Sequence, residues 1–160
     1  MAIRTNIPGT SPYEPTIGFS RAVRIGDQIH VSGTGPVGAD DAGIAEQTDQ
    51  CLTLIASALK QAGSSIEHVY RTRIYLTHVE DWEAAAQVHG KFFSLIRPAA
   101  TMIVVAALLN PSWRVEIEAD AQVPDGIVTD EIDLRNRIRQ IETHALDRLR
   151  KRRTDPTPTD

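Results

Sequence analysis

Cysteine, aromatic residues and long apolar runs are all scarce in this chain of 160 residues. The single cysteine, Cys51, excludes an internal disulfide framework and a cysteine-based zinc site. The longest apolar candidate, 102–109, falls far short of the roughly 18 residues that a membrane span needs. Residues 1–10 carry Arg4 but lack the apolar segment of a secretory signal. These absences predict a cytoplasmic protein that does not enter a membrane.

Basic residues are also too few for a nucleic-acid platform in most of the chain. Residues 1–128 hold nine Lys and Arg against fourteen Asp and Glu, which gives −5, and residues 129–160 hold eight against seven, which gives +1. Nucleic-acid binding needs a basic face and stacking rings, but aromatic residues make up only 5% of the chain. The basic cluster at 148–153 suits the C-terminal end of a helix, which we prefer to a nucleic-acid or anionic-membrane site. We expect no nucleic-acid partner and no membrane partner.

The length and an apolar content of 41% suit one packed core with an extension. A break at Pro124-Asp125-Gly126 predicts a body at 1–125 and a C-terminal extension at 126–160. Apolar residues at spacings of four, three, four and four predict a helix in the extension; they are Leu134, Ile138, Ile141, Ala145 and Leu149. Alternating proline and threonine predict a disordered end over 154–160.

The body alternates between strand-like and helix-like patterns. Prolines at positions 8, 12 and 15 predict an extended, irregular lead-in over 1–17. The predicted elements are strands 19–25 and 28–31 joined by a tight turn, a helix from 44 that stops at Gly63, strand 69–77, helix 82–96, and strands 101–109 and 113–123. This order, ββ, α, β, α, ββ, predicts an α+β fold, a two-layer sandwich in which two helices cover one face of a mixed sheet.

The uncovered face of the sheet is predicted to carry charge. Two strands alternate apolar and polar residues, and the polar ones are Arg71, Arg73, Tyr75, Glu116, Glu118 and Asp120. Strand 101–109 is apolar on both faces, which predicts a buried central strand with Met102 and Val104 on the open face. An isolated monomer would expose this apolar surface, so we infer an oligomer.

Short motifs also occur in a fixed order along about 17–123. They are Phe19-Ser20-Arg21-Ala22-Val23, Val31-Ser32-Gly33-Thr34, Gln47, Ala62-Gly63, Phe92-Phe93, Arg97-Pro98-Ala99 and Val115-Glu116-Ile117-Glu118-Ala119. Together they resemble the RidA/YjgF family of small enamine and imine deaminases. The resemblance implies a chorismate-mutase-like α+β sandwich. It also implies a homotrimer whose sheets face inward and whose small-molecule sites lie at the subunit interfaces.

The resemblance implies hydrolysis of 2-imino and enamine acids to 2-keto acids and ammonia. Such chemistry needs an arginine fork for the substrate carboxylate and a group that orients the attacking water. Typical members place the arginine after a Pro-Ala pair, a glutamate in the last strand and a tyrosine in the first. This chain keeps Glu116, but Ala100 stands at the arginine position, Phe19 at the tyrosine position and Ala86 at a common asparagine position. We expect 2-imino acid hydrolysis to be slower than in typical members by on the order of a hundredfold.

Glu116 is the candidate catalytic residue, and its alternative role is a salt bridge to an arginine of a neighbouring strand. The candidate substrate-binding residues are Phe19, Ser32, Gly33, Thr34, Arg73, His89, Ala100 and Thr101. Hydroxyls at the end of a strand often bond to their own backbone, and a lone histidine in an apolar stripe is often a packed core residue. No second ligand stands at a suitable spacing from His89, so we predict no metal and no cofactor.

Three functions stay open at this point. The first is a hydrolase, a deaminase of imines or enamines, in which Glu116 orients water between subunits. The second is a non-catalytic trimeric module that binds a metabolite, and the third is a platform whose C-terminal helix recruits a partner. Ala100 favours binding or a changed substrate, whereas Glu116 and the glycine-flanked end of its neighbouring strand favour hydrolysis.

Overall fold

The computed structural model describes residues 3–124. Its main elements are β1 (Arg4–Ile7), β2 (Ala22–Ile25), β3 (Gln28–Thr34), α1 (Ile44–Gln61), β4 (Val69–Leu76), α2 (Trp82–Phe93), β5 (Ala99–Val104) and β6 (Val115–Gln122). Short helical turns lie at Glu14–Gly18, Ile66–His68 and Val79–Asp81. This set of strands and helices confirms the predicted α+β class.

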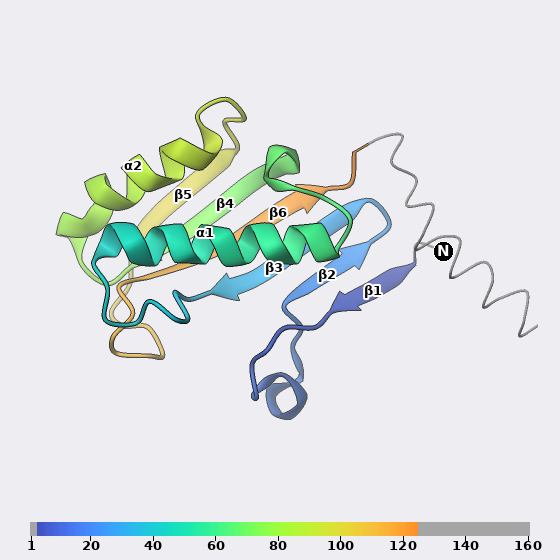
Figure 1. The fold of residues 1–160 in the computed structure, drawn as a ribbon, viewed down its shortest axis with the longest axis horizontal. Helices are drawn as coiled ribbons and strands as arrows, with labels where there is room; N and C mark the ends of the chain where they lie inside the picture. The colour runs from blue at the N-terminus through green and yellow to red at the C-terminus, as the bar shows by residue number, and fades with distance from the viewer. Residues whose placement is uncertain (1–2, 125–160) are drawn as a thin grey trace, which may run out of the picture. The chain divides into compact units, whose positions relative to one another are not determined.

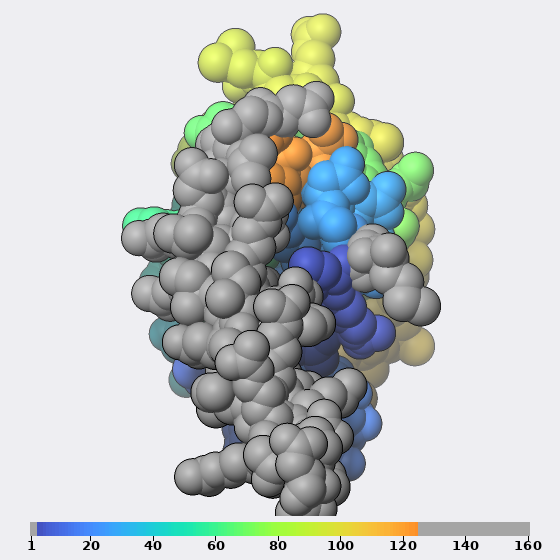
Figure 2. All heavy atoms as spheres, turned by 90° about the vertical axis from the view of Figure 1, so that its right-hand side faces the viewer, coloured from blue at the N-terminus to red at the C-terminus, as the bar shows by residue number. Residues whose placement is uncertain are grey.

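The strands form one mixed sheet in the order β1-β2-β3-β6-β4-β5. All neighbouring strands are antiparallel except β4 and β5, which are parallel and connected through α2. Both helices lie on one face of this sheet, which confirms the predicted two-layer sandwich (Figure 1). Figure 2 shows the end of β6 beside the β2–β3 turn, where the Val123 N–H donates to the Asp27 carbonyl at 2.7 Å.

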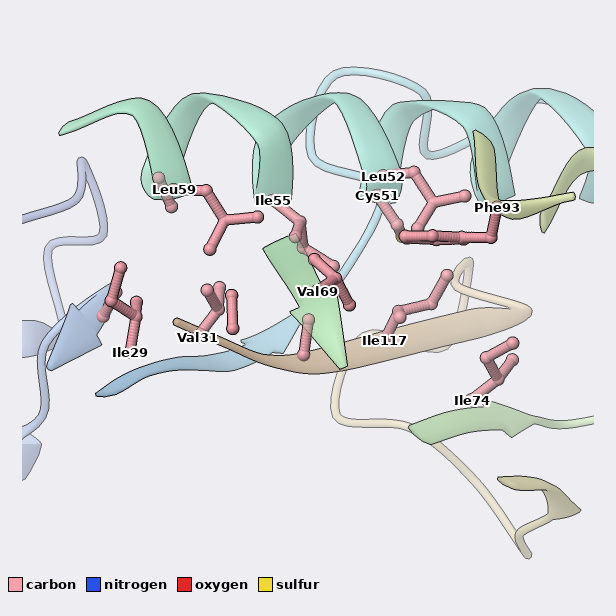
Figure 3. Packing of buried hydrophobic residues seen from close by; sticks show 14 of the residues in the cluster. Ile29, Val31, Cys51, Leu52, Ile55, Leu59, Val69, Ile74, Phe93 and Ile117 are labelled. Atoms are coloured by element: carbon pink, nitrogen blue, oxygen red, sulfur yellow. The ribbon is translucent and has the colours of Figure 1, made fainter. Parts of the chain in front are cut away.

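The core lies between α1 and the sheet. Apolar residues recur in α1 every three or four positions, so one stripe of the helix faces the strands. The buried residues of this stripe are Gln47, Thr48, Cys51, Leu52, Ile55, Ala58 and Leu59. Figure 3 shows members of the stripe packed above Ile29, Val31 and Ile117 of the sheet. Gly63 follows the helix at a φ of +86°, which confirms the predicted glycine stop.

The prediction of an irregular lead-in over 1–17 is wrong. β1 pairs with β2 antiparallel and brings Ile7, which is 5% exposed, opposite Ala22. A helical turn with Pro15 near its start then occupies Glu14–Gly18. The prolines all follow β1, so none of them removes a hydrogen-bond donor from its ladder. The observed strand is also shorter than the predicted strand 19–25. The helical turn ends at Gly18, and β2 begins only at Ala22.

The predicted buried central strand over 101–109 is also wrong. β5 spans Ala99–Val104 and lies at the edge of the sheet, where it pairs only with β4 and is largely exposed. Met102 and Val104 are in register with buried residues of β4, so they lie on the helix-covered side and not on the open face. An apolar run without periodicity cannot distinguish a central strand from an edge strand, which explains the error.

The predicted charged rows on the open face are confirmed. Arg73 Nη1 lies 3.2 Å from Asp120 Oδ2 and 3.7 Å from Glu118 Oε2. The Tyr75 hydroxyl donates to Glu118, and His30 Nδ1 lies 2.8 Å from Asp120 Oδ1. Opposite charges directly across neighbouring strands contribute roughly 0.2–1 kcal/mol per pair, so this network helps to fix the register of β4 against β6.

The predicted extension at 126–160, with its helix and its disordered end, lies outside the described residues. The division of the chain near residue 125 therefore stays a prediction. Among residues 3–124, no helix combines the length and the apolar character that crossing a membrane requires. The cytoplasmic location stays a prediction as well.

Candidate functional site

Glu116 lies in β6, half-buried beside the end of β3. Gly33 comes so close that a Cβ atom built on it would lie 2.1 Å from Oε1 of Glu116. The register between β3 and β6 shifts between Val31 and Thr34, and an irregularity of this kind bends a strand and re-aims its backbone. The missing side chain of glycine is therefore what lets the Glu116 carboxylate rest on the backbone of β3.

The surroundings of Glu116 suit a general base. Burial raises the pKa of Glu116 above the ordinary value for glutamate, the positive charge of Arg21 lowers it, and Glu118 raises it. A carboxylate with a raised pKa takes a proton from water more readily than an exposed one, because its charged form is less well solvated. The predicted catalytic residue is thus a half-buried carboxylate whose pKa is raised above the ordinary value for glutamate.

The two predicted hydroxyls near Glu116 bond to the main chain. Ser32 Oγ donates to the Ser20 carbonyl at 2.8 Å, and Thr34 Oγ1 donates to the Ser32 carbonyl at 2.8 Å. Arg21 adds two bonds, from Nη1 to Thr34 Oγ1 at 3.2 Å and from Nη2 to the Gly33 carbonyl at 2.9 Å. Arg21 is not among the predicted site residues, although it belongs to the Phe19–Val23 motif. Its place in that motif was the available signal.

The helical turn Glu14–Gly18 comes directly before the segment that carries Phe19 and Arg21. Phe19 is half-buried with an extended backbone, and its N–H donates to the Glu14 carbonyl at 3.3 Å. Both carboxylate oxygens of Glu14 accept the Gly9 N–H at 3.0 Å, so the turn is tied to the end of the lead-in. The segment that carries Phe19 and Arg21 is therefore braced on its N-terminal side.

His89 of α2 and Ala100 of β5 are both neighbours of Thr72 in β4, and they form a group that is separate from Glu116. His89 Nε2 lies 3.0 Å from Thr72 Oγ1, and the His89 ring centroid lies 4.5 Å from that of Phe93. Burial lowers the pKa of His89 below the ordinary value for histidine. Ala100 stands directly opposite Thr72 in the β4–β5 register, on the helix-covered side of the sheet. The side chain of His89 is thus packed between α2 and the sheet.

Arg73 and Thr101 stand opposite each other on the open face. Arg73 is engaged by Glu118 and Asp120, and Thr101 is exposed at the edge strand. Glu116 also belongs to the open face, whereas Ala100 belongs to the covered one. One chain therefore does not bring Glu116 together with position 100, because the sheet itself separates them.

Other reactive groups are few in the described part of the chain. Among residues 3–124, no three His, Cys, Asp or Glu side chains gather into a cluster that could hold a metal ion. Cys51 is buried in the core, and burial raises the pKa of its thiol, so the reactive thiolate is disfavoured. The expectation that no metal and no cofactor takes part stays a prediction.

Residues 10–123, which include every predicted site residue, match a known protein family. The family model described as Endoribonuclease L-PSP matches residues 10–123, which is most of the chain. The crystal structure of Rv2704 from Mycobacterium tuberculosis, described as a member of the YjgF/YER057c/UK114 family, is 45% identical with a TM-score of 0.71, and it covers 76% of this chain and 100% of its own. The chain belongs to the RidA/YjgF family. The resemblance predicted from the motifs is confirmed.

Further relatives show the range of this RidA/YjgF family. The protein SCO2049 of Streptomyces coelicolor is 34% identical over 115 residues, which are 69% of this chain and 86% of that protein. The 2-iminobutanoate/2-iminopropanoate deaminase of Homo sapiens is 32% identical over 110 residues, which are 64% of this chain and 78% of that enzyme. The structure of NMB1025 from Neisseria meningitidis is 29% identical with a TM-score of 0.68, covering 78% of this chain and 98% of its own. The chain is thus a relative of imine deaminases.

Proposed function

We propose that this RidA/YjgF protein hydrolyses the C=N bond of a small imine or enamine, with Glu116 as the base that activates water. The contact between Glu116 and Gly33 carries the proposal, because it holds a half-buried carboxylate in a fixed position on the open face. The relatives named as 2-iminobutanoate/2-iminopropanoate deaminases support the class of reaction.

The proposed reaction consumes one water molecule, and Glu116 gives up each proton that it takes. Glu116 takes a proton from water while the water oxygen bonds to the imine carbon. The electron pair of the C=N π bond moves to nitrogen, which then takes that proton from Glu116. In the resulting carbinolamine, the hydroxyl proton passes to nitrogen by way of Glu116. The C–N bond then breaks, a C=O bond forms and ammonia leaves. An enamine enters the same route after a proton from solvent adds to its terminal carbon and an N–H proton returns to solvent, which together give the imine.

Two features support a site that is shared between copies of the chain. Glu116 and Ala100 lie on opposite faces of one sheet, so a site that uses both positions needs a second chain. β5 is also a largely exposed edge strand without a charged residue, which is a surface that other chains can cover. We take the assembly to be the homotrimer that the family resemblance implies.

The proposed substrate differs from that of typical members in its anionic group. Position 100 carries alanine, so no guanidinium stands there to bind a carboxylate. An arginine fork contributes about 1.5–3 kcal/mol for each charge-assisted hydrogen bond. A neutral imine, or one whose charge is bound elsewhere, therefore suits this site better than a 2-imino acid.

Ammonia release from 2-iminobutyrate and from a neutral imine, each generated in situ, tests the proposal. The wild type should favour the neutral imine, and Glu116→Gln should lose turnover of both. Ala100→Arg should raise turnover of 2-iminobutyrate by on the order of a hundredfold, because it restores the fork. Equal ammonia release by the wild type and Glu116→Gln would contradict hydrolysis and favour the metabolite-binding module.

The matching family model is described as an endoribonuclease, so RNA cleavage is a second candidate function. The open face argues against an RNA backbone, because Glu116, Glu118 and Asp120 form an acidic row along β6. We expect no RNA cleavage at protein concentrations that give imine turnover. The same preparation, incubated with a labelled single-stranded RNA, measures this, and Glu116→Gln provides the matched control.

A further inference from the structure

Arg21 lies directly before β2 and is half-buried against the end of β3. Its Nη2 donates to the Gly33 carbonyl at 2.9 Å and its Nη1 to Thr34 Oγ1 at 3.2 Å. These two residues form the stretch of β3 on which Glu116 rests, since Gly33 leaves no room for a Cβ atom beside the Glu116 carboxylate. Arg21 therefore fixes the backbone that defines where Glu116 lies.

The charge of Arg21 also acts on Glu116 without a direct ion pair. No ion pair between the described residues joins Arg21 to Glu116 within 4.0 Å. Burial lowers the pKa of Arg21, and the charges of Glu14 and Glu116 raise it, so Arg21 lies in the field of both carboxylates. A guanidinium stays protonated in proteins, so this positive charge persists at every pH that the enzyme meets.

The other ionisable groups around Glu116 do not supply a positive charge. Glu118 lies on the same strand, and Tyr75 stands opposite Glu116 in β4. Cys51 approaches from α1, where burial raises the pKa of its thiol. Among the described groups that act on Glu116, Arg21 thus carries the positive charge, and this charge lowers the pKa of Glu116 where burial raises it.

We propose that Arg21 is a positioning residue for Glu116, which both anchors the Gly33–Thr34 backbone against the carboxylate and holds a positive charge near it. The catalytic part of this inference rests on the proposed function of Glu116. The two bonds from Nη1 and Nη2 hold the Arg21 guanidinium against the end of β3, on the side of the sheet strand that faces Glu116 in the β3–β6 pairing.

Arg21→Gln and Arg21→Lys test the proposal, with Arg24→Gln as the matched control. Arg24 lies in β2 and is also half-buried, and it donates to the carbonyls of Gly26 and Ala62 at 2.8 and 3.1 Å. Arg24→Gln therefore loses comparable bonds to main-chain oxygen without removing a charge beside Glu116. Circular dichroism and urea unfolding verify that each variant is folded before it is compared.

Carbon-13 NMR titration of the Glu116 carboxylate gives the decisive readout. Arg21→Gln should move the midpoint of the titration upward by about one pH unit, while Arg21→Lys and Arg24→Gln should stay close to the wild type. The acidic limb of the pH–rate profile should shift by the same amount, with activity recovering at higher pH. An unchanged Glu116 titration in folded Arg21→Gln overturns the proposal. If the wild type shows no turnover, the proposed function fails, and the NMR titration still decides the role of Arg21.

Discussion

At the scale of the residue, the site depends on side chains that are absent as much as on those that are present. Gly33 leaves room for the Glu116 carboxylate, and Ala100 removes the guanidinium that typical family members carry. In the proposed reaction, the first absence positions the base, and the second changes which substrates can bind beside it. Each absence can be reversed by one substitution, so the two effects can be separated.

Gly33→Ala should impair catalysis while the fold persists. The added Cβ would lie 2.1 Å from Oε1 of Glu116, so the carboxylate has to move. Because the displaced atom is the end of a flexible side chain, the backbone needs little change, but a misplacement of about 1 Å can cost about a hundredfold in rate. The measurements are kcat/KM for the imine substrate and the midpoint of thermal unfolding.

Gly90→Ala is the control for that substitution. Gly90 lies inside α2, and an added Cβ there meets no atom within 4 Å. Alanine in a helix is more favourable than glycine by roughly 0.5–1 kcal/mol, so this variant should unfold at a higher temperature with unchanged activity. Equal kcat/KM values for Gly33→Ala and the wild type would show that the contact with Gly33 does not position Glu116 for catalysis.

His89 should make the fold less stable in mild acid. Burial lowers its pKa in the folded chain, while the unfolded chain keeps a value near 6.5, so the unfolded state binds the proton more readily. Its contribution is complete above that value and is lost as the pH falls through the lower folded value. Urea midpoints at about pH 7.5 and about pH 5.5 should therefore differ less for His89→Gln than for the wild type. An exposed control, His78→Gln, should behave like the wild type.

Sequence motifs identified Glu116, because the alternation along its strand placed it on the polar face beside Glu118 and Asp120. They did not identify Arg21 as part of the site. The predicted strand 19–25 contains Arg21, whereas β2 begins only at Ala22, so alternation along the predicted strand did not show where Arg21 lies. Its partners in β3 are 12 and 13 residues away. Such a contact depends on how two strands pair, which local patterns do not specify.

At the scale of the element, the helices and two of the four inner strands, β4 and β6, agreed with the sequence patterns, and the edge strands did not. α1, α2, β4 and β6 each have one apolar side that faces a partner, so their periodicity is strong. β1 and β5 lie at the two edges and each pair with one neighbour. With little buried surface to impose alternation, edge strands leave a weak pattern in the sequence.

Ile7→Ala tests whether β1 contributes to the core. Ile7 is 5% exposed and pairs with Ala22, so its truncation should lower the free energy of unfolding by about 2–5 kcal/mol. Ile3 is 50% exposed just before the same strand, and Ile3→Ala should cost less than about 1 kcal/mol. Urea unfolding gives both values. Equal small losses would mean that the lead-in does not pack as β1.

At the scale of the whole molecule, the important point is the face of the sheet on which position 100 lies. Ala100 lies on the covered side of the edge strand, and Glu116 lies on the open side of the middle of the sheet. A substrate that contacts both has to lie between two chains. The family resemblance implies a trimer, and the sheet geometry gives a physical reason why the proposed activity should depend on it.

Mixing two inactive variants tests this shared site directly. Glu116→Gln removes the base, and Ala100→Trp fills the position of the missing fork, so each should form an inactive trimer by itself. If each site takes Glu116 from one chain and position 100 from the next, trimers reassembled from an equal mixture should regain about a quarter of the wild-type activity. The measurements are ammonia release before and after reassembly, with light scattering to verify the mass of the trimer. A site built within one chain would regain no activity, and a monomer at micromolar concentration would exclude the shared site altogether.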